Sequence, residues 1–468
     1  MIERTIPTHD VSVKNGGTTF APEREVEVLI VGSGPAGMSA ATAAASCGRR
    51  VVVLDDNAAE GGQIWRASCD EHERPDSDHK LRHEVRTAFA RSGAELLAGR
   101  RLVDAPQPHR LRAARETSQG TVIESFRWQR LILATGARER LLPFPGWTLP
   151  GVYGAGGLQA LVRGGFPVEG KRIVVAGTGP LLLAVAAHLQ QAGARIVCVA
   201  EQASMRQLLP FALAAIKDRT KLRQGLRYRM ELMGSPYRTG CWPVAALGSG
   251  RIEAVRLTDG SATWEEPCDA LACGFHLVPN TEPARLLGCE MEENAVKVDA
   301  FQRTSQETIY CAGEPTGVAG LGAALIEGRI AGLSAADCPK QTLGLHTLRN
   351  AERDFGSVLD RSFRLREELR HLAAPETIVC RCEDVPYARL ANKRSWTEAK
   401  LHTRCGMGPC QGRICGAATQ VLFGWRVTSV RPPLSPIPLS ALCEDAAVHH
   451  PFDNLNPQEA HVGQEISR

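Results

Sequence analysis

The sequence has few aromatic residues, little net charge and no long apolar run. Phe, Trp and Tyr make up 5% of the 468 residues whereas glycine occurs 45 times, which suits a nucleotide-binding α/β protein better than an all-β sandwich. The formal net charge of +4 is too small to indicate nucleic acid or an anionic membrane as the main partner. No stretch of about 18 apolar residues is present to span a bilayer, so we expect no transmembrane segment.

The sequence also lacks the apolar core of a secretory signal, which Met1 to Thr19 does not supply. We therefore expect a cytoplasmic protein, peripheral to the inner membrane at most through its partners. Thiols stay reduced in that compartment, so fifteen cysteines indicate metal or redox chemistry rather than disulfides. Eight of them lie far from any other cysteine and are interpreted as small buried hydrophobes. Clustering occurs only between Cys380 and Cys415.

The order of apolar runs, glycine turns and alanine-rich stretches predicts an α/β chain with two dinucleotide-binding (Rossmann-like) domains and a small helical C-terminal domain. Strand, turn, helix and strand follow one another between residues 26 and 54, and again between residues 171 and 200. The predicted divisions are a flexible arm (1–24), the first domain (25–150), the second domain (151–290), a return to the first (291–340), connecting helices (341–375), a cysteine-bearing domain (376–430) and a proline-rich strap and tail (431–468).

The first glycine turn, Gly32-Ser33-Gly34-Pro35-Ala36-Gly37, stands between a predicted strand and a predicted helix. Gly32 permits the sharp turn, Gly34 lets a pyrophosphate approach the backbone, and Gly37 brings helix close to strand. The helix that opens with Pro35 and Ala36 offers unpaired N–H groups to the phosphates. Asp55 ends the next strand, where a carboxylate can bind both ribose hydroxyls, and Asp56 is the alternative if the strand is one residue longer.

Three further segments favour FAD over NAD at this turn. They are Gly61-Gly62-Gln63 after the second strand, an apolar strand closing in Ala134-Thr135-Gly136, and Ile309-Tyr310-Cys311-Ala312-Gly313-Glu314 before a Gly- and Ala-rich helix. Together with the turn they resemble the two-dinucleotide-fold flavoprotein superfamily, in which the last segment closes over the ribityl chain. That superfamily usually has Asp where this chain has Glu314, so the resemblance implies the site but not the same hydrogen bond.

The second turn, Gly177-Thr178-Gly179-Pro180-Leu181-Leu182, has leucine in place of the third glycine. Leu182 is expected to push the helix off the strand or to distort the turn, while Glu201 remains suited to a ribose diol. Two interpretations stay open: a working NAD site, or a retained fold that holds an adenine nucleotide (NAD or ATP), or nothing, without hydride transfer. The lost glycine favours the second. His276 is expected near this domain's ligand edge, as a structural residue rather than a catalyst.

Four cysteines, Cys380, Cys382, Cys410 and Cys415, form two close pairs that a short helical segment can bring together. Both structural zinc and iron–sulfur clusters accept four thiolates. The C-x-C opening and the neighbouring glycines, which free backbone N–H groups to point at sulfide, favour a 2Fe–2S cluster. Cys405 is set aside as a ligand because its expected place is the turn before the Gly-Met-Gly loop, although an exchange with Cys410 is conceivable. No close cysteine pair of the disulfide-reductase type follows the first unit or lies in the second domain.

The block from Cys380 to Cys415, with Thr403-Arg404-Cys405-Gly406-Met407-Gly408-Pro409-Cys410-Gln411-Gly412-Arg413, resembles the 2Fe–2S domain named after bacterioferritin-associated ferredoxin. Residues 25–435, including Leu142-Pro143-Phe144-Pro145-Gly146-Trp147, resemble the α (A) subunits of heteromeric amino-acid and opine dehydrogenases, which include opine oxidases, D-hydroxyproline dehydrogenase and hydrogen cyanide synthase.

This resemblance implies a flavin-dependent oxidoreductase subunit with FAD and a 2Fe–2S cluster. A partner β flavoprotein of amino-acid-oxidase type, with or without a small γ subunit, would oxidise the C–N bond of an opine or D-amino acid, and a quinone or other acceptor would receive the electrons. Two alternatives stay open: an NADH-dependent FAD and iron–sulfur reductase, and a scaffold whose cofactors mainly hold an assembly together. The catalytic residues are not identified from the sequence.

Overall fold

The first parallel sheet is built from near-continuous Val, Ile and Leu runs, as expected for strands that are buried on both faces. This computed structural model describes residues 18–66, 78–427 and 430–442. The strand order is β4-β3-β2-β7, and β20 pairs with the last three residues of β7, on the edge opposite β2. These pairings are all parallel. The strands are β2 (Arg24–Val31), β3 (Val51–Asp55), β4 (Glu95–Ala98), β7 (Gly120–Leu133) and β20 (Ile309–Cys311).

The long strand β7 also carries an antiparallel extension. It pairs with β6 (Arg110–Thr117), which in turn pairs with β5 (Arg101–Gln107). Strand β1 (Thr19–Phe20) pairs parallel with β7, so this part of the predicted flexible arm lies in the sheet; the rest of the arm, up to residue 17, lies outside the described residues. Helix α2 (His79–Arg91) packs on α1 (Pro35–Ser46).

Two glycines of helix α8 (Leu321–Ala335) allow it to lie directly against α1. A Cβ on Gly328 would stand 2.1 Å from the Ala36 carbonyl oxygen, and one on Gly332 would stand 2.2 Å from that of Ala40. Backbone therefore meets backbone, which only glycine permits. This contact fixes the segment before α8, the short 3-10 helix η1 (Glu314–Thr316), over the first glycine turn.

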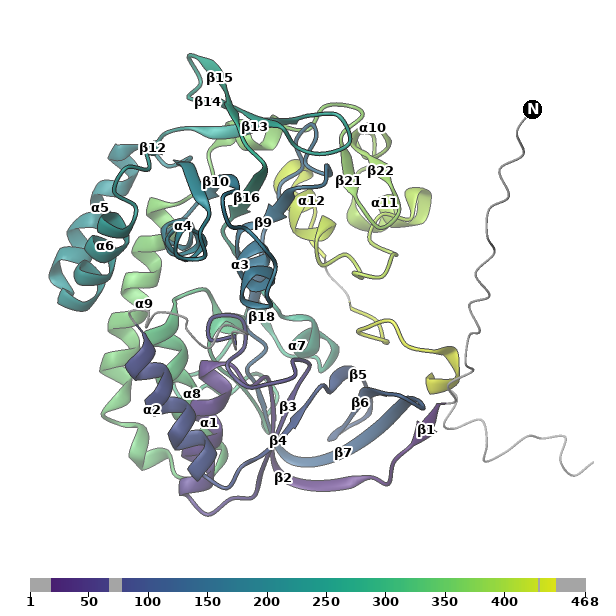
Figure 1. Cartoon of the computed structure of the whole chain (residues 1–468). Coiled ribbons are helices and arrows are strands. Elements are labelled where there is room, and N and C mark those ends of the chain that lie inside the picture. The colour runs from purple at the N-terminus through teal and green to yellow at the C-terminus, as the bar shows by residue number, and fades with distance from the viewer. Residues whose placement is uncertain (1–17, 67–77, 428–429, 443–468) are drawn as a thin grey trace, which may run out of the picture.

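The second domain has a parallel sheet in the order β12-β11-β10-β16-β9 and an antiparallel sheet β13-β14-β15 (Figure 1). Its elements are β9 (Val152–Gly154), α3 (Ala155–Arg163), β10 (Arg172–Thr178), α4 (Leu181–Gln191), β11 (Arg195–Glu201), α5 (Met205–Lys217), α6 (Arg219–Glu231), β12 (Tyr237–Thr239), β13 (Trp242–Leu247), β14 (Ala254–Thr258), β15 (Thr263–Pro267) and β16 (Ala270–Phe275). The predicted class of two dinucleotide-binding folds is confirmed.

An antiparallel ribbon of β8 (Ala137–Glu139) and β17 (Leu277–Pro279) joins the two domains. The chain returns to the first domain after β17, earlier than the predicted residue 291, because Ala284 and Cys289 pack in the same core as Leu111 and Phe126. Along the return lie α7 (Glu282–Leu286), β18 (Met291–Glu292) and β19 (Ala295–Val296).

The cysteine-bearing domain has its own small core around Val379, Leu390, Trp396 and Trp425. Its elements are β21 (Ile378–Cys380), β22 (Val385–Pro386), α10 (Tyr387–Leu390), α11 (Trp396–Thr403) and α12 (Cys415–Phe423). The connection before it contains η2 (Pro339–Thr342), α9 (Leu345–Ser362) and η3 (Glu367–His371).

The proline-rich strap runs back to the first domain. Leu434 donates its backbone N–H to the Val103 carbonyl over 2.7 Å, and Ala441 in η4 (Leu439–Leu442) packs against Ile123. The predicted tail from residue 443 onward lies outside the described residues. Among the helices that the structure describes, none is long and apolar enough to cross a bilayer.

Candidate functional site

The first glycine turn depends on two glycines that no other residue could replace. A Cβ on Gly32, whose φ is +104°, would stand 2.2 Å from the Ala134 carbonyl oxygen. A Cβ on Gly37 would stand 1.8 Å from the Gly32 carbonyl oxygen. Strand β2, helix α1 and the end of β7 therefore meet at backbone contact, which is the geometry that the sequence pattern predicts.

The N-terminus of α1 is open toward the remaining members of the turn. Gly34 is its N-cap and supplies no side-chain cap, Pro35 occupies the first turn of the helix, and Ala36 is buried behind it. A Cβ on Gly34 would meet only the Cα atom of Gly62, at 3.9 Å. Free backbone N–H groups beside open space make this a place where a pyrophosphate fits.

Asp55 is buried at the end of β3 and organises the turn. Its Oδ2 accepts hydrogen bonds from the backbone N–H and the hydroxyl of Ser33, and its Oδ1 accepts from Asn57. Asp56 is exposed next to it. Gln63 is exposed as well, and its side-chain oxygen accepts from Arg66 over 2.9 Å.

Glu314 has one carboxylate oxygen that is suited to a hydroxyl ligand. One carboxylate oxygen accepts the Gly320 N–H over 3.1 Å, and the other, Oε2, is buried without a hydrogen-bond partner among the described residues. Gly313 lies against Ala36 at the start of α1, so this orphaned oxygen belongs to the same site as the phosphate cradle. The residues thus fit FAD, whose ribityl hydroxyls can satisfy a buried carboxylate.

Thr135 and Gly136 are held at the edge of this site by Asn280 from the returning chain. The Thr135 hydroxyl donates to the Asn280 carbonyl over 2.6 Å, the Asn280 side-chain amide donates to the Thr135 carbonyl over 2.9 Å, and the Asn280 N–H donates to the Gly136 carbonyl. All the residues predicted around the first turn therefore lie on one edge of the first sheet or on the loops that cover it.

We expect Glu314 to make the flavin-free protein less stable at alkaline pH. Burial raises the pKa of Glu314 from 4.5 to about 7. A carboxyl whose pKa rises on folding contributes stability below its unfolded pKa and loses it as pH rises through the folded value. Glu314→Gln should therefore raise the free energy of unfolding at pH 8 by up to about 3 kcal/mol, and by almost nothing at pH 4. Urea unfolding of flavin-free protein at the two pH values measures this; equal effects at both would contradict it.

The fold gathers a polar group beside Glu314 that includes His276, which was expected at the ligand edge of the second domain, and two residues that sequence reasoning missed, Arg140 and Asp360. His276, at a φ of +75° between β16 and β17, places its Nε2 atom 3.2 Å from the Asp360 carboxylate of α9. Arg140 follows β8, and its buried Nε has no hydrogen-bond partner among the described residues. Burial lowers the pKa of Arg140, and Asp360 partly offsets this. Of these features, only the left-handed φ of His276 is set locally. The contacts join segments that lie far apart in the sequence, so no sequence pattern predicts the grouping.

The second glycine turn keeps its fold, but its helix begins more tightly than α1 does. A Cβ on Gly177 would stand 1.8 Å from the Gly274 carbonyl oxygen, so the close strand contact persists. Gly179 has a φ of +106°. Leu182 is buried among Val175 and Val185, and the first turn of α4 is tightened to i→i+3 hydrogen bonds, whereas α1 opens with an i→i+4 bond. This is the expected distortion of the turn.

Glu201, predicted to bind a ribose diol, is fully buried and already engaged. Its carboxylate accepts from the Thr178 hydroxyl, the Gly179 N–H and the Ala203 N–H at 2.8 Å each. Despite these donors, burial raises the pKa of Glu201 to about 7. Asp55 accepts a similar set of hydrogen bonds, and Glu201 differs from it in having no solvent-exposed surface, so a nucleotide ribose could reach Glu201 only if the surrounding chain moved.

The chain between α9 and η3 closes over the same strand ends. The Gln202 side-chain amide donates to the Arg364 carbonyl and accepts the Arg366 N–H, both at 3.2 Å. The guanidinium of Arg366 lies 3.8 Å from the centre of the Trp242 ring and donates to the Gly240 carbonyl. Segment 363–366 thus occupies the edge of the second sheet where a second dinucleotide would be expected.

Five cysteine thiols come together in the C-terminal domain. The sulfur atoms of Cys380, Cys405 and Cys415, all buried, lie within 4.8 Å of one another. Cys410 interacts with Cys415 and Cys382, and Cys382 is the exposed member. The group therefore contains the four predicted ligands and also Cys405, which sequence reasoning set aside. Arg404 explains the difference, because its left-handed φ of +64° ends α11 and turns Cys405 into the core.

Backbone N–H groups point at these sulfurs. The thiols of Cys405 and Cys415, and then the N–H groups of Gly406 and Glu383, lower the pKa of Cys380 to about 2. The Cys415 thiol and the N–H groups of Ile414 and Gly412 lower that of Cys410 to about 5. The neighbouring thiols raise the pKa of Cys415, and, against the backbone N–H of Cys410, burial together with the Cys410 thiol raises that of Cys382, so a low pKa is not common to the whole group. The N–H donors are what suit the group to hold a metal centre as thiolates.

The loops around the cysteines are tightly closed. A Cβ on Gly408 would stand 2.3 Å from the Cβ of Cys382, and one on Gly406 would stand 2.5 Å from the Trp396 ring. Arg404 forms a 2.7 Å ion pair with Glu383, which joins the two cysteine-bearing loops. The glycines therefore bring the loops together as well as exposing N–H groups.

Arg138 of β8 connects the two candidate cofactor sites. Its Nε donates to the Arg413 carbonyl, between Cys410 and Cys415, over 3.0 Å, and its Nη1 donates to the Asn280 side chain over 2.7 Å. Asn280 in turn holds Thr135 and Gly136. One arginine and one asparagine thus span the gap between the cysteine loop and the edge of the first nucleotide site.

The profile of the family described as pyridine nucleotide-disulphide oxidoreductase matches residues 26–336, well over half of the sequence. The chain belongs to this family. The resemblance to the A subunits of heteromeric dehydrogenases is also confirmed. Among these A subunits, that of opine oxidase from Agrobacterium tumefaciens is 31% identical to this chain over 87% of each protein. The chain is also 30% identical to "Hydrogen cyanide synthase subunit HcnB" of Pseudomonas aeruginosa, over 88% of this chain and 97% of that one.

Two solved structures show the same fold. L-proline dehydrogenase from P. horikoshii superposes with a TM-score of 0.60 at 17% identity, covering 91% of this chain and 80% of that chain. Thioredoxin reductase from T. acidophilum superposes with a TM-score of 0.51 at 22% identity, covering 67% and 98%. These findings establish a flavin-dependent oxidoreductase of this family with a role in electron transfer, and they support FAD as its cofactor.

The disulphide chemistry in the family's description has no counterpart in the second domain of this member. Burial raises the pKa of Cys198 and Cys268 to about 12 and that of Cys241 to about 11, which makes these thiols unreactive. They pack in the core of the second domain. This agrees with their interpretation as small hydrophobes.

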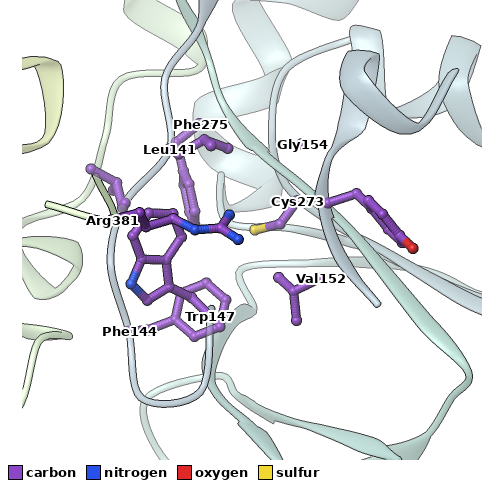
Figure 2. A pocket seen from close by; sticks show the side chains of 10 residues that line it. Leu141, Phe144, Trp147, Val152, Gly154, Cys273, Phe275 and Arg381 are labelled. Carbon is purple, nitrogen blue, oxygen red and sulfur yellow. The ribbon is translucent and has the colours of Figure 1, made fainter. Parts of the chain in front are cut away.

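A small cavity lies where the second domain meets the cysteine-bearing domain. Figure 2 shows Arg381, from between Cys380 and Cys382, reaching over the Trp147 ring toward Cys273. The cavity measures about 20 Å³, room for one water but not for an organic substrate. Trp147 also donates its indole N–H to the Ile378 carbonyl over 2.6 Å. The Leu142–Trp147 motif therefore serves to dock the cysteine-bearing domain.

Proposed function

We propose that this protein is the electron-transfer subunit of a heteromeric dehydrogenase, with FAD in its first domain and a 2Fe–2S cluster in its C-terminal domain. When bound, FAD accepts two electrons and can release them singly, whereas a 2Fe–2S cluster carries one at a time. The observation that supports the proposal is the Arg138 connection, a hydrogen-bonded path from the Arg413 carbonyl, between Cys410 and Cys415, to the Asn280 side chain beside Thr135 and Gly136.

A 2Fe–2S cluster suits the cysteine group better than zinc. The C-x-C opening of Cys380 and Cys382 favours an iron–sulfur centre over zinc, whose sites favour C-x-x-C hairpins, and the backbone N–H groups that aim at sulfur would tune such a centre. A cluster needs four of the five thiols. We propose Cys380, Cys382, Cys410 and Cys415 as the ligands. In the competing set, Cys405 replaces Cys410 or Cys382, the two cysteines outside the close group of three.

The substrate would be oxidised mainly on a different polypeptide. The relatives are named as subunits of opine oxidase and hydrogen cyanide synthase, so the reaction we propose breaks a C–H bond next to nitrogen in an opine or a D-amino or imino acid such as octopine, nopaline or D-hydroxyproline. The partner would be a β flavoprotein of amino-acid-oxidase type, with or without a small γ subunit. The electrons would pass to a quinone or similar acceptor.

Co-purification tests this division of labour. The chain is expressed with the proteins encoded beside it, and reduction of a dye is followed with octopine, nopaline, D-hydroxyproline and glycine. Dye reduction should require the second subunit with one of these substrates. Oxidation of a substrate at full rate by the isolated chain would overturn the proposal.

The alternative function is an NADH-dependent reductase, and the rate at which NADH reduces the flavin distinguishes it from the proposed function. Because Glu201 is engaged and segment 363–366 covers the second sheet edge, anaerobic NADH should reduce the flavin at least about a hundredfold more slowly than substrate does through the partner subunit. Stopped-flow absorbance of the oxidised flavin measures both rates. Rapid bleaching by NADH alone would favour the reductase.

A further inference from the structure

Helices α5 and α6 expose an apolar surface that nothing in the described chain covers. Seven of their large side chains, or those just after α6, are 55% to 73% exposed: Met205, Leu209, Leu213, Ile216, Leu226, Met230 and Met233. On α5 they recur at intervals of four, four and three residues, and on α6 at four and three, so each set forms a stripe along one face. The opposite face of α5 packs on the protein through Phe211, which contacts Phe355 and Phe363.

The same helices hold the positive charge of the molecule. Residues 205–233 contain seven Lys and Arg against two Asp and Glu, a formal net charge of +5, whereas the whole chain has +4. The rest of the protein is therefore close to neutral. Arg223 and Arg229 are exposed and have no carboxylate partner among the described residues. The small overall charge hides a strongly basic surface.

The place of this surface argues against a docking site for an electron-exchanging subunit. Figure 1 shows α5 and α6 side by side at one edge of the second domain, on the opposite side from the cysteine-bearing helices α11 and α12. A subunit seated on the hairpin would be far from the sulfur cluster. A lipid surface exchanges no electrons with the cluster, so it need not lie close to it.

We propose that the α5–α6 hairpin binds the protein to an anionic membrane surface. Exposed aliphatic stripes flanked by arginine are the composition with which interfacial helices enter the headgroup region. Anionic lipids attract basic segments at the membrane surface over about one Debye length. The inference is independent of the proposed electron relay, since it depends only on the hairpin.

Vesicle co-sedimentation of the full-length chain, with any subunits that accompany it, tests this proposal. Vesicles of phosphatidylglycerol and phosphatidylethanolamine should bind the protein, and vesicles of phosphatidylcholine should bind it at least tenfold less. Raising the salt to 0.5 M (about a 4 Å screening length) should weaken binding to the anionic vesicles.

Two hairpin variants and one control locate the surface. Leu209→Gln/Leu213→Gln/Ile216→Gln and, separately, Arg223→Glu/Arg229→Glu should each reduce binding at least tenfold, with flavin absorbance and unfolding temperature as folding checks. Leu401→Gln on α11, where the side chain is 77% exposed, should bind like the unmodified chain. If the triple variant fails to fold, the arginine variant decides.

Three results would overturn the proposal: equal binding to neutral and anionic vesicles, no binding at all, or undiminished binding of the variants. Loss of a co-purifying subunit with unchanged vesicle binding would also overturn it and mark the hairpin as a protein interface. In none of these cases is the relay between the cofactor sites affected, so the two proposals fail separately.

Discussion

Replacing Cys415 with serine is expected to remove nearly all iron and acid-labile sulfide from the protein while leaving FAD in place. Cys415 stands at the N-terminus of α12 and interacts with the thiols of Cys380, Cys405 and Cys410. It therefore belongs to both proposed ligand sets, and a hydroxyl is a poor substitute for a thiolate toward iron. The first nucleotide site is built on separate elements. Iron and sulfide analysis with visible absorbance of the anaerobically purified chain measures the effect.

Cys47→Ser is the matched control for this variant. Cys47 is half-buried at the end of α1, remote in the fold from the cysteine-bearing domain, so its replacement should leave iron at about two atoms per chain. Comparing Cys405→Ala with Cys382→Ser and Cys410→Ser then identifies the remaining ligands, because only the loss of a true ligand should release iron. Full retention of iron by the Cys415 variant, or a metal analysis that returns zinc, would refute the cluster.

Replacing Gly34 with alanine is expected to weaken flavin binding strongly without unfolding the protein. The φ of Gly34 is −70°, an ordinary value for alanine, and the added Cβ would meet no protein atom closer than 3.9 Å. It would instead enter the space at the start of α1 where the pyrophosphate should approach. Overpacking costs about 1–3 kcal/mol, roughly ten- to a hundredfold in FAD affinity. Flavin absorbance per chain and titration of the flavin-free protein with FAD measure it.

Gly225→Ala in α6 serves as the control for this substitution. No protein atom lies within 4 Å of the added Cβ and the site is in the middle of an exposed helix, so flavin content should stay unchanged and stability should rise by up to about 1 kcal/mol. Gly37→Ala is not a suitable control, because its Cβ would overlap the Gly32 carbonyl and should impair folding as well as flavin binding. Normal FAD affinity in the Gly34 variant would show that the phosphates lie elsewhere.

Local sequence patterns were sufficient for the two strand–turn–helix–strand units and for the neighbourhood of the first turn. Helix α4 lies inside the unit predicted between residues 171 and 200, and β3 ends at Asp55 as expected. These elements follow from apolar runs interrupted by glycine, whose causes lie within a few residues of chain. The return to the first domain was misplaced because α7 is short and polar, and only its packing with Leu111 and Phe126 identifies its domain.

The features that sequence reasoning missed all depend on contacts between distant segments. Arg138 meets Arg413 across 275 positions, and Gln202 meets Arg364 across 162. Neither pair has a periodicity or a motif. Cys405 was misjudged for a more local reason, since a non-glycine residue in the left-handed region, Arg404, redirects the chain just before it. The overall charge likewise gave no hint of a basic hairpin in an otherwise near-neutral molecule.

The peptide that crosses the second sheet edge also leads directly into the cysteine-bearing domain. Arg364 and Arg366 are fixed by Gln202 and Trp242, and the first cysteine follows a short distance later at position 380. In a dinucleotide-binding enzyme, that edge would empty and fill as coenzyme came and went. Here a covalent segment takes its place permanently, so in the proposed relay the placement of the cysteine-bearing domain would be set by the chain itself and would stay the same whatever the cell's ratio of reduced to oxidised coenzyme.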